Sequence, residues 1–177
     1  VTMQTIAGGL WIPPGLPTSS SGAPFFSSTN SLTTANRRTA SIFRVPKSGT
    51  LRYVEMRQHL TGNTPDNGLR VSFMDVNSNG DPDGSEDQFR VITSGFGNGA
   101  WLVPPGPMTD DGTDGGVKRS VTAGDLLAVV VRFENFVASD SIQIGTLSSS
   151  ALNSGQLDPQ QKYPLSSTDG GTVWTKD

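Results

Sequence analysis

The residues with the clearest chemical spacing lie in the segment DVNSNGDPDGSE, residues 75–86. Side chains that carry oxygen recur there at every second position and end on a glutamate, with a glycine in the middle. Calcium binds six to eight hard oxygen atoms, which carboxylate, amide and backbone carbonyl groups supply in proteins. The spacing predicts a Ca²⁺ site whose ligands are Asp75, Asn77, Asn79, Asp81 through its backbone carbonyl, Asp83 and Glu86.

The same segment resembles the calcium loop of an EF-hand, in which ligands occupy positions one, three, five, seven, nine and twelve and glycine occupies position six. Two features depart from that pattern. Pro82 stands at position eight, where an aliphatic residue is usual, and the residues after Glu86 have the pattern of a strand instead of a helix. The resemblance implies a loop-type calcium site and not an EF-hand domain. The alternative is a hairpin loop whose Asn-Gly and Asp-Gly dipeptides form turns.

Catalysis requires positioned acids, bases or nucleophiles, and the sequence offers few of them. It contains one histidine and three glutamates, and no serine lies in a Gly-x-Ser-x-Gly elbow. His59 shares a strand face with Glu55 and Arg57, which is typical of a solvated face with cross-strand pairs. A second acidic segment, TDDGTDGG at residues 109–116, lacks a ligand spacing and is interpreted as a solvated turn. We therefore expect a protein that is not an enzyme.

Aromatic residues suggest two kinds of contact. Trp11 lies beside stiff, proline-rich backbone outside the predicted domain, a combination suited to anchoring on a neighbour. The expected anchor comprises Trp11, Pro13, Pro14, Phe25 and Phe26. A second set of aromatic residues could stack on sugar rings, namely Trp101, Tyr163 and Trp174. For Trp101, inside a predicted strand, packing on the core is the alternative.

The composition limits the classes of partner. Charged residues make up 16% of the chain and the formal net charge is −3, without a cluster of Lys or Arg, so nucleic acid is not an expected partner. The longest apolar run, LLAVVV at residues 126–131, is far shorter than the ~20 residues that span a bilayer, so no membrane segment is expected. A polar surface with few charges favours an extracellular protein or a component of a virion.

The hydrophobic pattern is that of β-strands. Short stretches rich in β-branched and aromatic residues, bounded by Gly, Pro, Asn or Asp, lie at residues 40–46, 51–60, 69–75, 88–93, 100–103, 117–122, 126–133, 141–147 and 172–175. In the strand at 88–93, alternation places Phe89 and Val91 on the apolar face. The run LLAVVV does not alternate, which is typical of a strand covered on both faces. Either the chain's own arm or another subunit would provide the second cover.

These elements predict a single all-β domain, a jelly-roll-like antiparallel β-sandwich at residues 40–147. Residues 1–39 and 148–171 are runs of Ser, Thr, Gly, Pro and Asn that cannot by themselves bury enough apolar surface to become ordered. We expect residues 1–39 to form an extended arm and residues 148–177 a loose extension whose end can return as a last strand. Neighbouring copies in an assembly would hold both. The alternative is an arm wrapped on its own domain.

The segment SVTAGDLLAVVVRFENFVASDSIQIG, residues 120–145, resembles the late strands of jelly-roll modules. Similar modules occur in carbohydrate-binding domains and in structural proteins of tailed-phage particles, and the resemblance extends over residues 40–147. It implies a β-sandwich without catalysis. The sequence therefore favours a structural or interaction subunit of a larger assembly, such as a capsid decoration or tail component of a virus or phage, that contacts its own copies or other assembly proteins. The alternative is a carbohydrate-binding module stiffened by Ca²⁺, and a particle protein could also bind a host glycan.

Overall fold

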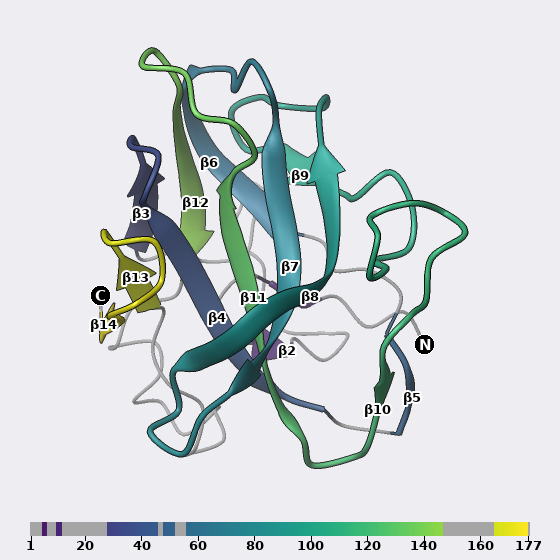
Figure 1. Cartoon of the computed structure of the whole chain (residues 1–177). Helices are drawn as coiled ribbons and strands as arrows, with labels where there is room; N and C mark the ends of the chain where they lie inside the picture. Colours follow the sequence, from purple (N-terminus) through teal and green to yellow (C-terminus); the bar gives the residue numbers. More distant parts are fainter. Residues whose placement is uncertain are drawn as a thin grey trace.

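The computed structural model of the chain describes residues 5–6, 10–11, 28–45, 48–51, 56–146 and 165–176. All regular structure in these residues is β-strand, and every strand pair is antiparallel, so the expected all-β class is confirmed. Figure 1 shows the strands arranged in layers, with β4, β11 and β7 side by side. Over the same residues, no helix has the length and apolar character needed to cross a membrane.

The larger sheet has six strands in the order β14-β13-β4-β11-β7-β8. They are β4 (Arg38–Arg44), β7 (Leu69–Val76), β8 (Pro82–Ile92), β11 (Leu126–Phe133), β13 (Leu165–Ser167) and β14 (Thr175–Lys176). β11 is central because it pairs with β4 on one side and with β7 on the other. The C-terminal strands join the same sheet, since β13 pairs with β4 and places Leu165 opposite Ala40.

The smaller sheet has four strands in the order β3-β12-β6-β9. They are β3 (Ser28–Leu32), β6 (Met56–Asn63), β9 (Trp101–Leu102) and β12 (Ser141–Thr146). Two short pairs are hydrogen-bonded separately, namely β5 (Gly49–Thr50) with β10 (Ser120–Val121) and β1 (Thr5–Ile6) with β2 (Leu10–Trp11). The described residues thus form a sandwich-like pair of sheets with two small two-stranded additions.

The main core lies between the two sheets. Alternation along β7 and β11 sends every second side chain inward, so that Phe73 and Val131 are only 2% and 3% exposed. The smaller sheet contributes Leu32, Met56 and Ile144 to the same cluster of buried side chains. Because burial of apolar surface contributes roughly 25 cal/mol per Å², this contact between the sheets is the main source of stability in the fold.

β11 is buried on both of its faces, as the run LLAVVV predicts. Its outward side chains, Ala128 and Val130, belong to a second buried cluster with Met74 and Leu165, and Trp174 packs against that cluster. Part of the cover over this face therefore comes from the chain's own C-terminal segment. For these residues the choice between the chain itself and another subunit is settled in favour of the chain.

Several strand boundaries differ from the expected ones. β3 lies inside the segment 1–39, which was expected to be an arm, and β4 begins at Arg38 instead of residue 40. β3 carries the polar sequence STNSL and buries Leu32, so hydrophobic alternation could not reveal it. Backbone pairing with β12 is sufficient to form such an edge strand. β8 begins at Pro82 instead of residue 88, because Pro82 and Asp83 also pair with β7.

Candidate functional site

Three arginines form a row across the outer face of the larger sheet, the face turned away from the smaller sheet. Arg70 on β7 lies opposite Arg132 on β11. Val131 on β11 pairs with Thr39 on β4. Because the strands are antiparallel, Arg132, the residue after Val131, lies beside Arg38, the residue before Thr39. Like charges directly opposite one another on neighbouring strands repel. This arginine row (Arg38, Arg132 and Arg70) is therefore stable only with carboxylates beside it.

Glu86 supplies the first carboxylate from an irregular part of β8. The register of β8 against β7 shifts at this point, and residues 84–87 form a bulge. The carboxylate of Glu86 accepts hydrogen bonds from Arg38 (3.0 Å) and from Nε and Nη2 of Arg132 (2.9 and 3.1 Å), and it lies 3.7 Å from Nη1 of Arg70. Its side chain is only 12% exposed. One carboxylate thus contacts all three members of the arginine row.

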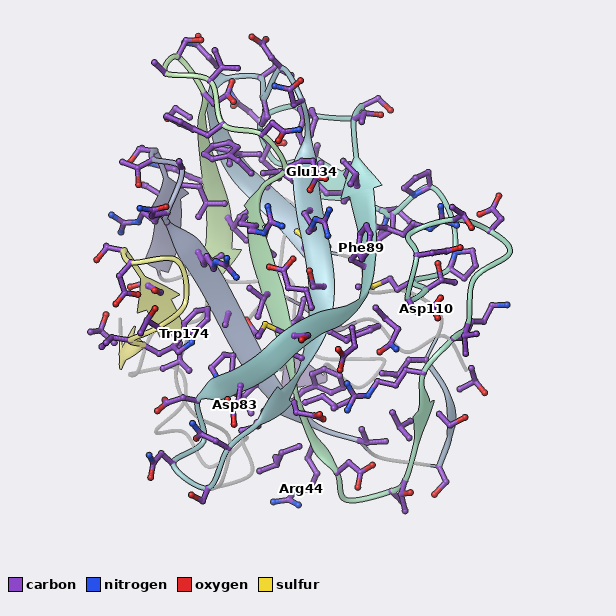
Figure 2. All side chains as sticks on the ribbon, viewed as in Figure 1. Arg44, Asp83, Phe89, Asp110, Glu134 and Trp174 are labelled. Atoms are coloured by element: carbon purple, nitrogen blue, oxygen red, sulfur yellow. The ribbon has the colours of Figure 1, made fainter. Side chains whose placement is uncertain are left out.

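Glu134, which follows the end of β11, supplies the second carboxylate. Arg70 donates to it through Nε (2.5 Å) and Nη2 (2.7 Å), a bidentate pair. These hydrogen bonds lower the pKa of Glu134 and raise the pKa of Arg70, whereas burial lowers the pKa of Arg38. The Arg70 guanidinium also lies 3.8 Å from the ring centroid of Phe89. Figure 2 shows Glu134 and Phe89 near the same end of the sheet.

The β7–β8 loop, which holds the predicted calcium ligands, is closed by its own hydrogen bonds. Oδ1 of Asn77 accepts from the backbone N–H groups of Asn79 (2.9 Å) and Asp81 (3.0 Å). The N–H of Asn77 donates to the carbonyl of Asp81 at 2.9 Å. Gly80 adopts a φ of +79°, which favours glycine. The amide oxygen of Asn77 thus serves the loop backbone, as in an Asx-turn.

The predicted calcium ligands are not gathered around one point. Glu86 faces the arginine row, and Asp75 forms an ion pair with Arg119. Across the described ranges, no group of three or more His, Asp or Glu side chains is arranged to hold a metal ion. The residues therefore do not fit the expected six-ligand arrangement, because their strongest oxygen ligands are bound to arginines or to the backbone. Calcium binding by the other oxygen atoms of the loop stays a prediction.

The segment 109–116, expected to be a solvated turn, is anchored by a buried arginine. Arg90 is 8% exposed, donates to two backbone carbonyls of this region at 2.6 and 2.7 Å, and forms an ion pair with Asp114. Asp111 accepts hydrogen bonds from the backbone N–H and the hydroxyl of Thr113, and these lower its pKa. The charged groups of this segment therefore shape the loop itself.

The sequence did not reveal the buried Arg90, because the predicted alternation along β8 placed the wrong set of side chains on the buried face. Phe89 and Val91, expected on the buried face, are partly exposed, whereas Arg90 and Ile92 are buried. The loop after β9 supplies the carbonyl groups that make burial of a guanidinium favourable. The available signal was the glycine-rich, aspartate-rich sequence of that loop, which can bend its carbonyls toward a cation.

The loop between β13 and β14 holds Trp174 in place. Oδ1 of Asp169 accepts hydrogen bonds from one hydroxyl and two backbone N–H groups of this loop, at 2.7, 3.0 and 3.1 Å. These bonds, the one from Val173 foremost, lower the pKa of Asp169. Gly171 has a φ of +92°, and a Cβ there would lie 3.3 Å from Cδ of Arg38 and 3.5 Å from Cζ2 of Trp174. The left-handed backbone therefore favours glycine in the turn that precedes Trp174.

A groove of about 480 Å³ separates this loop from the β7–β8 loop. Figure 2 shows Trp174 and Asp83 in the same part of the molecule, at the end of the larger sheet where β8 begins. One wall of the groove includes Asn79, Asp81 and Asp83, and the other includes Thr172, Val173 and Trp174. The structure thus brings one predicted sugar-stacking residue next to the loop that was predicted to bind calcium.

The other predicted site residues fall outside what the structure describes. The backbones of Trp11 and Trp101 belong to β2 and β9, but their side chains lie outside the described set, as does that of His59. The residues that lie wholly outside it are Pro13, Pro14, Phe25, Phe26, Glu55 and Tyr163. The expected assembly anchor therefore stays a prediction, and so do two of the three proposed stacking residues.

No family model, curated protein or solved structure matches the chain. The described residues offer two features. One is the arginine row, whose charge is largely balanced by Glu86 and Glu134. The other is the groove beside Trp174, which is lined by polar side chains.

Proposed function

We propose that the chain is a non-catalytic structural or interaction subunit of a larger assembly, and that its sandwich is a jelly roll. The strand order carries this proposal. Without β13 and β14, the larger sheet reads β4-β11-β7-β8 and the smaller sheet reads β3-β12-β6-β9. When these strands are lettered B to I along the chain, the sheets read C-H-E-F and B-I-D-G, the order expected of a jelly roll. Viral capsid proteins and lectins both use this architecture.

The use of charge supports a role without catalysis, since fold alone does not decide function. Both described glutamates, Glu86 and Glu134, are bound by arginines, and Arg90 and Arg119 pair with aspartates. A general acid or base must be free to exchange a proton with its substrate. Carboxylates that hold strands and loops together are not free in this sense, so these groups act in the stability of the subunit.

The placement of β3 supports a role in assembly. β3 is an edge strand of the smaller sheet, so the chain enters the sandwich at a rim, where a preceding segment can reach a neighbour. Among the described residues, two valines away from the groove beside Trp174 are strongly exposed, Val103 at 45% and Val117 at 68%, and contact with a neighbour would bury such side chains. The proposed partners are further copies of the chain or other proteins of a virus or phage particle, in the virion or outside the cell.

Analytical ultracentrifugation tests the assembly role. The full chain is compared with a version that begins at Ser27, which keeps β3 and its pairing with β12. We expect the full chain to sediment as an oligomer and the shortened chain as a monomer with an unchanged melting temperature. In the full chain, Phe25→Ser combined with Phe26→Ser should also give a monomer, whereas the control Ser19→Ala combined with Ser20→Ala should not. A full chain that stays monomeric at all concentrations overturns self-assembly.

A further inference from the structure

The groove beside Trp174 combines apolar and hydrogen-bonding surfaces. Trp174 and Val173 form its apolar side, and Val173 is 58% exposed. Asn79 and Asp83, both exposed, lie on the opposite wall. Its volume of about 480 Å³ falls within the roughly 300–1,000 Å³ typical of small-molecule sites. A sugar ring matches this combination because its C–H face is apolar while its rim carries hydroxyl groups.

Both walls are formed before a ligand arrives. The amide oxygen of Asn77 fixes the β7–β8 loop, and the carboxylate of Asp169 fixes the loop that carries Trp174. Among the described residues, no hydrogen bond joins the side-chain amide of Asn79 to another group. Asp83 uses Oδ1 to cap the next N–H at 2.9 Å, which leaves Oδ2 for a ligand. Preformed walls with available polar atoms lower the entropic cost of binding.

The charge of the groove selects among ligands. Asp81 and Asp83 line it, and its described lining residues include no lysine or arginine. Such a wall repels carboxylate, sulfate and phosphate groups, so acidic glycans are disfavoured. A carboxylate accepts hydrogen bonds from hydroxyl groups, and the amide of Asn79 can both donate and accept. The hydroxyl of Thr172 donates to the carbonyl of Asp169 at 3.4 Å and can accept from a ligand. The neutral groups favour a polyhydroxyl ligand over a purely cationic one.

We propose that this groove binds an uncharged saccharide, with one sugar ring packed against Trp174 and its hydroxyl groups hydrogen-bonded to Asn79 and Asp83. The inference goes beyond the structural role and does not depend on it. Saccharide binding is measured on the single chain, whereas assembly is measured by sedimentation, so either can fail without the other. In a particle protein, such a groove would give the assembled surface an affinity for neutral glycans.

Isothermal titration calorimetry and saturation-transfer NMR on the full chain test the proposal. The probes are maltotriose, cellotriose, mannotriose, galactotriose and N-acetylchitotriose, with 3′-sialyllactose as the acidic comparison and trilysine as the cationic one. We expect at least one neutral trisaccharide to bind and sialyllactose to bind about tenfold more weakly. Trp174→Ala and Asn79→Ala should each weaken binding about tenfold. The control Asp87→Asn changes an exposed carboxylate outside the groove and should leave binding unchanged.

Trp174 packs on the second buried cluster, so its replacement can also lower stability. Asn79 lies on an exposed turn, so Asn79→Ala should leave the melting temperature unchanged. A loss of binding in that variant therefore reports on the groove, and melting temperatures are recorded for both variants. The proposal is overturned if no neutral trisaccharide binds at a ligand concentration of about 10 mM, which would detect a complex even weaker than one with a dissociation constant of about 1 mM. It is also overturned if trilysine alone binds, if sialyllactose binds equally well, or if Asn79→Ala binds as the unaltered chain does.

Discussion

Replacing Glu86 with glutamine should strongly destabilise the fold although the side chain keeps its shape. The carboxylate receives hydrogen bonds of 2.9–3.1 Å from Arg38 and Arg132 and lies 3.7 Å from Arg70. The three arginines and the two glutamates, Glu86 and Glu134, have a net charge of +1, and the substitution makes it +2. The amide group cannot neutralise the guanidinium groups, and its own N–H atoms face them.

The expected loss of unfolding free energy follows from the burial of Glu86 and from the number of hydrogen bonds that its carboxylate accepts. Hydrogen bonds to charged groups contribute about 1.5–3 kcal/mol each, and removing one partner of a fully buried ion pair costs about 3–5 kcal/mol. Glu86 is 12% exposed and the arginine side chains are 19–23% exposed, so solvent screens part of the effect. We expect Glu86→Gln to lower the free energy of unfolding by about 2–4 kcal/mol. Asp87→Asn, one residue later, should change it by less than about 0.5 kcal/mol.

Urea unfolding followed by circular dichroism measures both variants. A double-mutant cycle with Arg132→Met measures the free energy of interaction between Glu86 and Arg132. Each single variant should be destabilised, and the double variant should be more stable than the sum of the two losses predicts by about 1 kcal/mol or more. A loss below about 0.5 kcal/mol for Glu86→Gln would show that the carboxylate behaves as an ordinary surface charge. That result would refute the reasoning from the arginine row.

Three further predictions concern pH, metal and backbone. Because the hydrogen bonds from Arg70 lower the pKa of Glu134, this group stabilises the fold above its unfolded pKa of about 4.3, and the contribution is lost as the pH falls through the lower folded pKa. Melting temperature should therefore fall on acidification below about pH 4, and Glu134→Gln should reduce that fall; an unchanged profile would contradict the assignment. If the β7–β8 loop binds calcium, Asp75→Asn combined with Asp83→Asn should lower the melting temperature more in calcium than in chelator, where only the ion pair of Asp75 with Arg119 is lost; equal losses in both buffers would reject the site. Gly171→Ala should lower stability by about 1–3 kcal/mol in urea unfolding, because the backbone is left-handed there; Gly115→Ala, where a Cβ meets no atom closer than 4.0 Å, is the matched control.

The part of the fold that could be predicted depends on strong side-chain patterns. The stretches 69–75 and 126–133 are strands in the structure because alternation, or an unbroken apolar run, leaves few other ways to bury their side chains. β3 and β13 are short and largely polar, and they form because a neighbouring strand supplies hydrogen-bond partners. No local pattern records that partnership, so single-sequence reasoning missed them.

The candidate site depends even more on contacts between distant segments. The spacing of Glu86 matched a calcium ligand, but the position of its carboxylate is decided by the register of three strands that bring arginines under the β8 bulge. Trp174 could be named from its residue type alone. The wall that faces it comes from Asn79 and its neighbours, nearly a hundred residues earlier in the chain, and only the folded sheet places the two loops together.

The pairing of β13 with β4 bears on how the chain folds while it is being made. Thr39 donates a hydrogen bond to the carbonyl of Leu165 across 126 residues of sequence. At a synthesis rate of roughly 5–20 residues per second, the last strand of the smaller sheet, β12, is made about 1–6 seconds before Trp174. During that interval β4 has an unpaired edge, and the outward side chains of Ala128 and Val130 lack part of their cover. Exposed edges and apolar faces of this kind recruit other unfinished chains, so the nascent protein is most vulnerable to aggregation just before residues 165–174 are complete.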